Sequence, residues 1–264
     1  MRSSFLDWLY SVDLQAMPDW LNRNQGVVGV GLFLATLLLG WGSGIFQALR
    51  RRPKFRFRLI DGPTFVCTFG VNKQQGQYQV HRTGVALYLD IANIGSAPSS
   101  IRAIQIGYHW ALKPFSLQWL KYSLGWFYLF HQTICLRDFQ VAIGENIKFY
   151  PFLMQKSGVS GDSVDTYLEI GKSAIGVVYF EQSDSWGGCF PFSLNGKVRV
   201  KIRIEDAFGR WHRKIVSIPK VSFVDAKKFN PSFGQTQASL HGEESPFELP
   251  VDQHGNILPP ATPV

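Results

Sequence analysis

The chain has 264 residues, of which 45% are hydrophobic, 14% aromatic and only 17% charged, with a formal net charge of +8. This length allows one sizeable globular domain, or at most two small ones, beside a short membrane segment, and the basic balance indicates anionic neighbours such as phospholipid headgroups or nucleic acid. Three widely spaced cysteines, Cys67, Cys135 and Cys189, argue against a disulfide framework and favour a reducing compartment.

Residues 1–25 form an N-terminal amphipathic segment. Apolar side chains recur there at helical spacing: Phe5, Leu6, Trp8, Leu9 and Val12. Pro18 is expected to break this helix, and Trp8 and Trp20 are rings of the kind that settle among lipid headgroups. We predict a short helix lying on the outer leaflet. The alternative is a frayed terminus with incidental aromatic residues.

Residues 26–49 contain no charged side chain, and at about 1.5 Å per residue they are long enough to cross a hydrocarbon core of about 30 Å. We therefore predict a transmembrane helix. A signal peptide fits poorly, because the basic cluster follows the apolar run. Thr36, Gly40, Gly44 and Ala48 fall four apart on one helix face, a pattern that favours helix dimers in lipid. The alternative is that glycine is simply frequent in membrane helices.

Residues 50–58 form a basic juxtamembrane linker and a first strand. The cations expected to touch the membrane surface are Arg50, Arg51, Arg52, Lys54, Arg56 and Arg58. Lys and Arg beside a span are retained on the cytoplasmic side. We therefore predict a single-pass protein of the plasma (inner) membrane, with its N-terminus outside and its C-terminal domain in the cytoplasm. The free cysteines agree with this orientation.

From residue 54 to residue 228 the hydrophobic period is two. The predicted strands are 55–59, 64–71, 77–82, 85–92, 101–110, 139–143, 147–152, 166–170, 174–181, 197–205 and 210–218. Many short strands with turns between them predict a mainly β domain, and an immunoglobulin-like antiparallel β-sandwich is the best match. The run 87–95, with Asn93 and Gly95 before a returning strand, resembles the middle hairpin of many such domains.

Residues 229–264 accumulate proline and carry local acidic charge, which predicts an extended or disordered tail. Such a tail is either inert or packs on the basic domain or a partner.

The segment 113–136 interrupts the strand pattern with large apolar side chains. Five of its rings are the predicted membrane contacts: Trp119, Trp126, Phe127, Tyr128 and Phe130. So apolar a loop either packs on the sandwich as an insertion or dips into the inner leaflet. A second span is disfavoured, because Lys121 lies near the middle of the segment.

Lys197, Arg199, Lys201 and Arg203 alternate with apolar residues, so all four leave one face of a sheet. This basic sheet face suits anionic headgroups. A phosphate backbone is a further option, and a solvated strand face is the simplest one. Nucleic acid is the least favoured partner, because no recognition motif accompanies the charge.

The segment 186–191 places Cys189 beside glycines and an aromatic residue, which is superficially similar to the nucleophile region of papain-like proteases. It departs from that pattern, and only His212 is available as a base, so we interpret Cys189 as a buried thiol in a turn. The six histidines are scattered and no calcium loop or phosphate-binding glycine loop is present, so we expect neither a metal nor another cofactor.

The preferred hypothesis is a membrane-anchored, non-enzymatic interaction module, whose partners are the lipid bilayer and either another protein or a second copy of the chain. The first alternative is a membrane-associating or membrane-perturbing effector that acts through residues 113–136. The second is a Cys-dependent hydrolase.

Overall fold

The computed structural model describes residues 16–43, 51–154 and 165–250. The chain divides into two compact units, Met1–Arg51 and Arg52–Val264. The second unit consists mostly of antiparallel sheets, and the first contains an apolar helix. The prediction of a mainly β protein with one apolar helix near its N-terminus is therefore confirmed.

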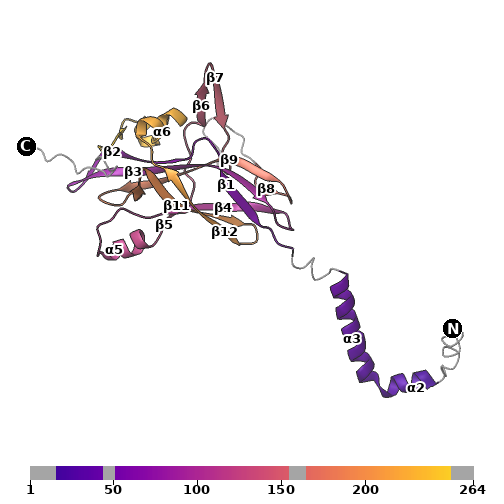
Figure 1. Ribbon diagram of the computed structural model, residues 1–264. Helices are drawn as coiled ribbons and strands as arrows, with labels where there is room; N and C mark the ends of the chain where they lie inside the picture. The colour runs from indigo at the N-terminus through magenta and orange to yellow at the C-terminus, as the bar shows by residue number, and fades with distance from the viewer. Residues whose placement is uncertain (1–15, 44–50, 155–164, 251–264) are drawn as a thin grey trace, which may run out of the picture. The chain divides into compact units, whose positions relative to one another are not determined.

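The N-terminal unit contains two helices, α2 (Ala16–Arg23) and α3 (Gln25–Gly42), which meet at Asn24 (Figure 1). Helix α2 begins two residues before Pro18 and continues past it. Pro18 lies in the first turn of α2, where its missing N–H has no helical acceptor to lose. The amphipathic pattern before it falls in residues 1–15, outside the described residues.

Helix α3 is the candidate span. Its 18 residues rise about 27 Å, and no other helix in the described ranges is long and apolar enough to cross a membrane. Thr36 and Gly40 of the predicted dimer face lie in α3, and the Thr36 hydroxyl donates to the Leu32 carbonyl at 2.7 Å. Gly44 and Ala48, with the end of the predicted span, lie outside the described residues.

The first sheet of the β unit is built around one long strand, β3. Its strands are β1 (Phe55–Leu59), β2 (Phe65–Gln75), β3 (Tyr78–Asn93), β9 (Ser173–Ser185) and β13 (Pro246–Phe247). Strands β1 and β2 pair with successive parts of β3, β9 pairs with β3 along nearly its whole length, and β13 pairs with β2. The two strands predicted at 77–82 and 85–92 are therefore one.

The second sheet is built around β4 and β11. Its strands are β4 (Ser99–Tyr108), β5 (Phe127–Leu129), β8 (Tyr167–Leu168), β10 (Ser193–Leu194), β11 (Lys197–Asp206) and β12 (Trp211–Pro219). Strands β11 and β12 form the predicted hairpin, with Lys197 opposite Pro219 and Glu205 opposite Trp211. Strand β4 pairs with β11 on one side and with β5 and β8 on the other.

One hydrophobic core joins the two sheets. Val198, Val200, Ile202 and Ile204 of β11 are fully buried in it together with the odd-numbered residues 85–91 of β3. Hydrophobic and charged residues alternate along β11 because every second side chain enters the core and the others point away from it. The loop 93–98 joins β3 to β4 and so crosses between the sheets. The hairpin expected there is wrong.

A second core covers the other face of the first sheet. Phe65, Cys67 and Phe69 of β2 enter it, packed under α6 (Phe223–Phe229) and Phe233. Since both faces of β2 are covered, every residue from Phe65 to Val71 is buried. The expectation of an extended or disordered tail is wrong for residues 229–250, because Phe233 and Leu249 are buried and β13 pairs with β2. Residues 251–264 lie outside the described residues.

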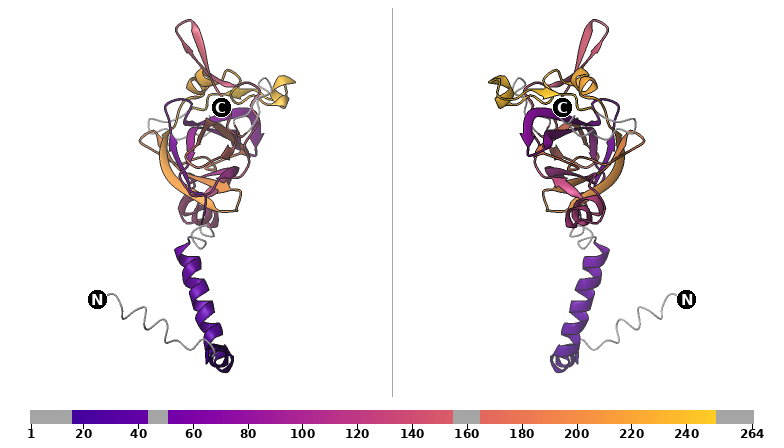
Figure 2. Two further views of the ribbon diagram at one scale, coloured as in Figure 1. Left: turned by 90° about the vertical axis from the view of Figure 1, so that its right-hand side faces the viewer. Right: turned by 90° about the vertical axis from the view of Figure 1, so that its left-hand side faces the viewer.

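Two features project from opposite sides of the β unit (Figures 1 and 2). The hairpin of β6 (Phe139–Ile143) and β7 (Asn146–Tyr150) stands out on the side that carries α6. On the other side lies a short helical segment, α5 (Leu117–Trp119), continued by a π-helical turn over Leu120–Leu124. The last helix, α7 (Gln237–Leu240), belongs to the C-terminal segment.

Candidate functional site

The aromatic segment and the basic sheet face meet on the outer surface of the second sheet. Strand β5 places Tyr128 opposite Gly107 of β4, and β4 in turn pairs with β11. A Cβ on Gly107 would lie 2.8 Å from the Tyr128 ring, so the absence of a side chain there lets the ring lie flat on the sheet. The sequence predicted the two groups separately and did not predict that they touch.

Aromatic rings cover the cations of β11. Lys201 Nζ lies 5.1 Å and the Arg199 guanidinium 5.9 Å from the centre of the Trp126 ring. The Arg203 guanidinium lies between Tyr128, at 5.1 Å, and Trp211 of β12, at 4.4 Å. We call these residues the cation–aromatic face: Trp126, Tyr128, Arg199, Lys201, Arg203 and Trp211. Stacking of this kind holds cations at a surface that is partly shielded from water.

Two polar atoms on this face are buried without a hydrogen-bond partner in the described part of the chain. They are Nε of Arg203 and Oε1 of Gln105, which lie directly opposite one another on β11 and β4. A buried polar atom usually has a partner. These two atoms are therefore an exception among the buried polar groups of the described residues.

Beyond the face, the chain forms an apolar tip, which we define as Phe115–Leu124. Phe115 is 96% exposed and Leu117 86% exposed, and Leu120 and Leu124 are exposed as well. Phe115 has a φ of 68°, a left-handed conformation that is strained for a bulky residue. These apolar side chains are exposed, and Lys113 and Lys121 flank or interrupt them. This combination is typical of a surface that is covered in use.

The base of the tip is fixed to the sheet. Trp110 packs against Tyr122 and Phe127, with ring centres 4.5 and 4.4 Å away. The Ser123 hydroxyl donates to the Trp110 carbonyl at 2.6 Å, and Ser116 caps α5 by accepting from the Trp119 N–H at 3.0 Å. The tip is therefore presented by a rigid base.

The predicted aromatic contacts divide into four groups. Phe127 packs against the core, Trp126 and Tyr128 cover cations, and only Phe130 is fully in the exposed class. Trp119 is partly covered, with its ring 5.9 Å from that of Phe115. Sequence reasoning missed the exposed apolar residues of the tip: Phe115, Leu117, Leu120 and Leu124. The sequence signal for this surface is the helical spacing of Leu117, Leu120 and Leu124.

The basic residues of the linker have mixed surroundings. Arg51, Arg52 and Lys54 are exposed, and so are Arg56 and Arg58 on β1, where Arg58 pairs with Asp90 at 2.8 Å. Arg50 lies outside the described residues. The predicted set is therefore solvent-accessible wherever it is described, although Arg58 has a carboxylate partner.

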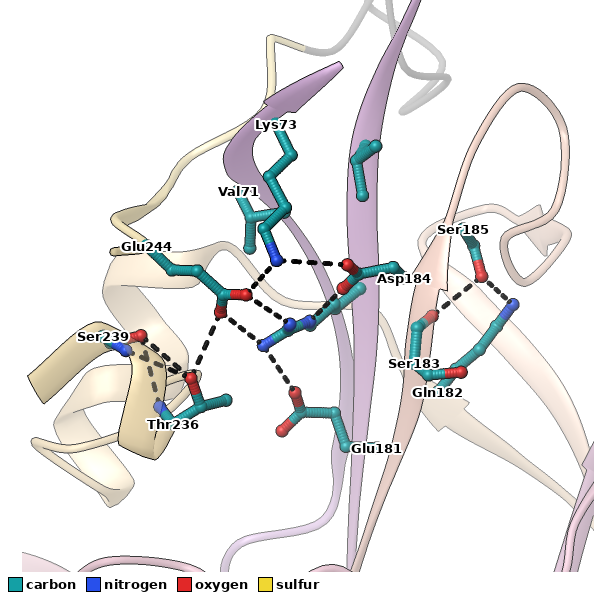
Figure 3. Close-up of polar contacts among 12 residues, drawn as sticks. Val71, Lys73, Glu181, Gln182, Ser183, Asp184, Ser185, Thr236, Ser239 and Glu244 are labelled. Carbon is teal, nitrogen blue, oxygen red and sulfur yellow. Dashed lines mark hydrogen bonds and ion pairs between the residues drawn. The ribbon is translucent and has the colours of Figure 1, made fainter. Parts of the chain in front are cut away.

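A buried ion-pair cluster holds the C-terminal segment on the first sheet (Figure 3). Arg82 of β3 contacts both carboxylate oxygens of Glu244 at 3.0 Å and Asp184 of β9 at 2.6 Å. Lys73 of β2 pairs with Glu244 as well, and Thr236 donates to that carboxylate at 3.1 Å. Burial would raise the pKa of Glu244, but Lys73, Arg82 and Thr236 hold it below its ordinary value. Glu244 is therefore bound in its charged form.

Glu181 of β9 lies on the edge of this cluster, at a cavity of about 500 Å³ whose lining includes Thr133, Cys135 and Thr236. The Tyr179 hydroxyl donates to its carboxylate at 2.8 Å, while the Arg82 guanidinium lies 3.8 Å away. Burial raises the pKa of Glu181, against the opposing effects of Tyr179 and Arg82. Its described polar contacts, with Tyr179 and Arg82, tie β9 to the ion-pair cluster.

The cysteines lie in apolar surroundings. Cys67 and Cys135 are buried, Cys189 is half-buried, and burial raises the pKa of each thiol. A nucleophilic cysteine needs the opposite shift. His212, the base expected to serve Cys189, is held instead by Asp206, whose Oδ2 lies 3.0 Å from Nε2.

Among the residues that the structure describes, no group of three His, Cys, Asp or Glu side chains could hold a metal ion. No protein-family model, no curated protein and no solved structure matches the chain. The surfaces described above are therefore the basis for a functional argument.

Proposed function

We propose that the protein is a non-enzymatic, membrane-anchored interaction module, in which α3 is the anchor and the β unit rests on the bilayer through its apolar tip. One observation carries this proposal: Phe115, Leu117, Leu120 and Leu124 are exposed together on a rigid base beside a cationic sheet face. A partner with an apolar interior and an anionic surface complements both features, and a phospholipid bilayer has both.

The expected free energy of this membrane contact is sufficient for a domain that is tethered to the bilayer. Burying a phenylalanine or leucine side chain contributes about 1.5–3 kcal/mol, and each cation near an anionic surface about 1 kcal/mol. Because the loss of translational and rotational freedom on association costs about 4–15 kcal/mol, such a contact is weak for a free domain. Because the tether keeps the β unit at a high effective concentration beside the bilayer, a weak contact is sufficient to orient it. The cation–aromatic face then meets the headgroups, where aromatic rings are favoured.

The tip is expected to enter the bilayer. In a full-length Leu117→Cys, Cys189→Ser variant carrying an environment-sensitive dye at position 117, dye emission in nanodiscs should shift to the blue and be quenched by spin-labelled lipids. The matched control is Ile143→Cys in the same background, because Ile143 is also exposed but lies on the hairpin on the other side of the β unit. Equal quenching at both positions, or none at position 117, would show that the tip does not insert.

The orientation remains part of the proposal. The basic residues after the span, together with free cysteines in apolar sites, support a cytoplasmic β unit at the inner membrane. A reporter that works only in the cytoplasm should be active when it is fused after Val264. If a reporter that works only outside the cytoplasm is active at this position, the orientation is wrong. The β unit could then not contact the anionic inner leaflet.

The strand pairing supports the immunoglobulin-like topology that we propose for the β unit. Strands β1, β3 and β9 pair as A, B and E do in that fold, and β4, β11 and β12 pair as C, F and G do. Strand β2 departs from the pattern, since it pairs with β3 next to the place of β1. This topology identifies no function by itself.

A protein partner is the second candidate, and the β6–β7 hairpin favours it. Ile147 and Phe149 leave one face of this hairpin and are exposed, although a two-stranded hairpin is only marginally stable when nothing packs on it. The exposed small-residue face of α3 around Thr36 and Gly40 offers self-association within the bilayer as a further option.

A further inference from the structure

A basic hollow lies where the chain enters the β unit. It is lined by Arg52–Lys54, by the loop Ile94–Ser96 and by Arg210 and His212. Backbone hydrogen bonds join the first two segments, from Ile94 N–H to the Lys54 carbonyl and from Ser96 N–H to the Arg52 carbonyl, both at 2.9 Å. A Cβ on Gly95 would lie 2.3 Å from the Lys54 nitrogen, so only glycine lets the strands approach this closely.

The charge of the hollow has one sign. Arg52, Lys54 and Arg210 bring three cations from two segments that are more than 150 residues apart, and no carboxylate lines the hollow. The nearest acidic partner of its lining residues is Asp206, which is fully buried and accepts the N–H groups of Phe208 and Arg210 at 2.9 and 3.0 Å. Asp206 thereby fixes the backbone of the β11–β12 turn that carries Arg210.

His212 is fixed in the same way. Its Nε2 lies 3.0 Å from Asp206, and its ring centre lies 5.1 Å from that of Phe55. The imidazole is therefore a rigid wall of the hollow, whereas the three cationic side chains are exposed and free to close on a ligand. The shared chemistry of these groups fits a phosphate, because guanidinium binds phosphate oxygens in pairs and ammonium binds them as a point charge.

We propose that this hollow binds the phosphate of an anionic lipid headgroup. The chain from the end of α3 at Gly42 to Arg52 can reach no further than about 36 Å when fully extended, so a hollow that begins at Arg52 is tethered to the membrane-spanning helix. A volume of about 500 Å³ accommodates a headgroup. The inference deepens the proposed function and rests on it, because it requires the β unit to lie at the bilayer.

The test is lipid binding by the detergent-solubilised full chain, measured by native mass spectrometry with short-chain phosphatidylserine, short-chain phosphatidylcholine and inorganic phosphate. Phosphatidylserine should bind at least tenfold more tightly than the other two, because its carboxylate adds a second anion beside the phosphate for the three cations, which phosphatidylcholine and inorganic phosphate lack. The double variant Lys54→Ala/Arg210→Ala should lose this preference. The control variant Arg137→Ala/Lys148→Ala, which removes the same charge from exposed positions elsewhere, should keep it.

The outcomes separate the two proposals. If Lys54→Ala/Arg210→Ala leaves the preference for phosphatidylserine unchanged while the dye at position 117 still enters the bilayer, the hollow is not the headgroup site and the proposed function stands. If inorganic phosphate binds as tightly as phosphatidylserine, the site serves a soluble phosphate and the lipid inference is wrong. If the dye at position 117 stays in water, the proposed function itself fails. Far-UV circular dichroism checks that the variants are folded.

Discussion

Replacing Arg82 by alanine is expected to destabilise the folded protein by about 3–5 kcal/mol, because the change leaves the buried Glu181 carboxylate without a cation and the buried Glu244 carboxylate with Lys73 alone. The Arg82 side chain is only 12% exposed, and it contacts Glu244 through two nitrogens and Asp184 through a third. Urea unfolding of the full chain in detergent, followed by near-UV circular dichroism, measures the loss. Since Glu244 lies in the C-terminal segment, limited proteolysis should also release this segment first.

Lys73→Ala is the matched control. Its side chain is 44% exposed and pairs with two of the same carboxylates, Glu244 and Asp184, so its loss should destabilise the protein much less than the loss of Arg82. If the two variants lose equal stability, the cluster does not depend on Arg82.

The effect of Arg82→Ala should also depend on pH. In the wild-type protein the pKa of Glu244 is lowered, so its contribution is present above the ordinary carboxyl pKa and is lost as the pH falls through the folded value. Without Arg82, the lowered pKa of Glu244 should rise, and the pKa of Glu181, which burial already raises, should rise further. The penalty is then largest at neutral pH and shrinks as the pH falls towards 4, because protonation removes the unpaired charges. A penalty that is the same at both pH values would contradict this explanation.

The strands that sequence reasoning placed best are those with one face in the core and one in water. Strand β11 is the clearest case, because Val200 and Ile202 are buried between Arg199, Lys201 and Arg203. Strand β2 is covered on both faces from Phe65 to Val71, so its burial does not alternate, and its partner β3 was predicted as two strands. Burial on both faces depends on α6 and the C-terminal segment, and the local sequence carries no signal of that cover.

The candidate site was predicted in parts. The cations of β11 and the rings of residues 126–128 were both identified, but their contact requires β4 to lie between β11 and β5, a pairing that no local pattern encodes. The same is true of the hollow, where Arg210 joins Arg52 and Lys54 only because β11 and β12 form a hairpin beside the loop at Gly95. Cations that are far apart in the sequence lie together only because the tertiary structure brings their strands and loops together.

Truncating Phe233 to alanine is expected to cost about 3–5 kcal/mol, although proline content predicted disorder for its segment. Phe233 is 2% exposed, and its ring lies 5.6 Å from those of Phe65 and Phe69 and 5.7 Å from that of Tyr179. The end of the Phe233 ring also fills the space above Gly84, where a Cβ on that glycine would lie 2.5 Å from the ring. Removing the ring therefore leaves a cavity in the second core.

Phe208→Ala supplies the matched control for this prediction, because the same atoms are removed from a turn residue that is 67% exposed. Its effect should stay within about 0.5 kcal/mol. Both variants are measured by urea unfolding of the full chain in detergent. A disordered C-terminal segment would make the two losses equal. A large loss confined to Phe233→Ala would mean that the chain beyond α6 is part of the folded unit, and that the first sheet is the middle of three layers.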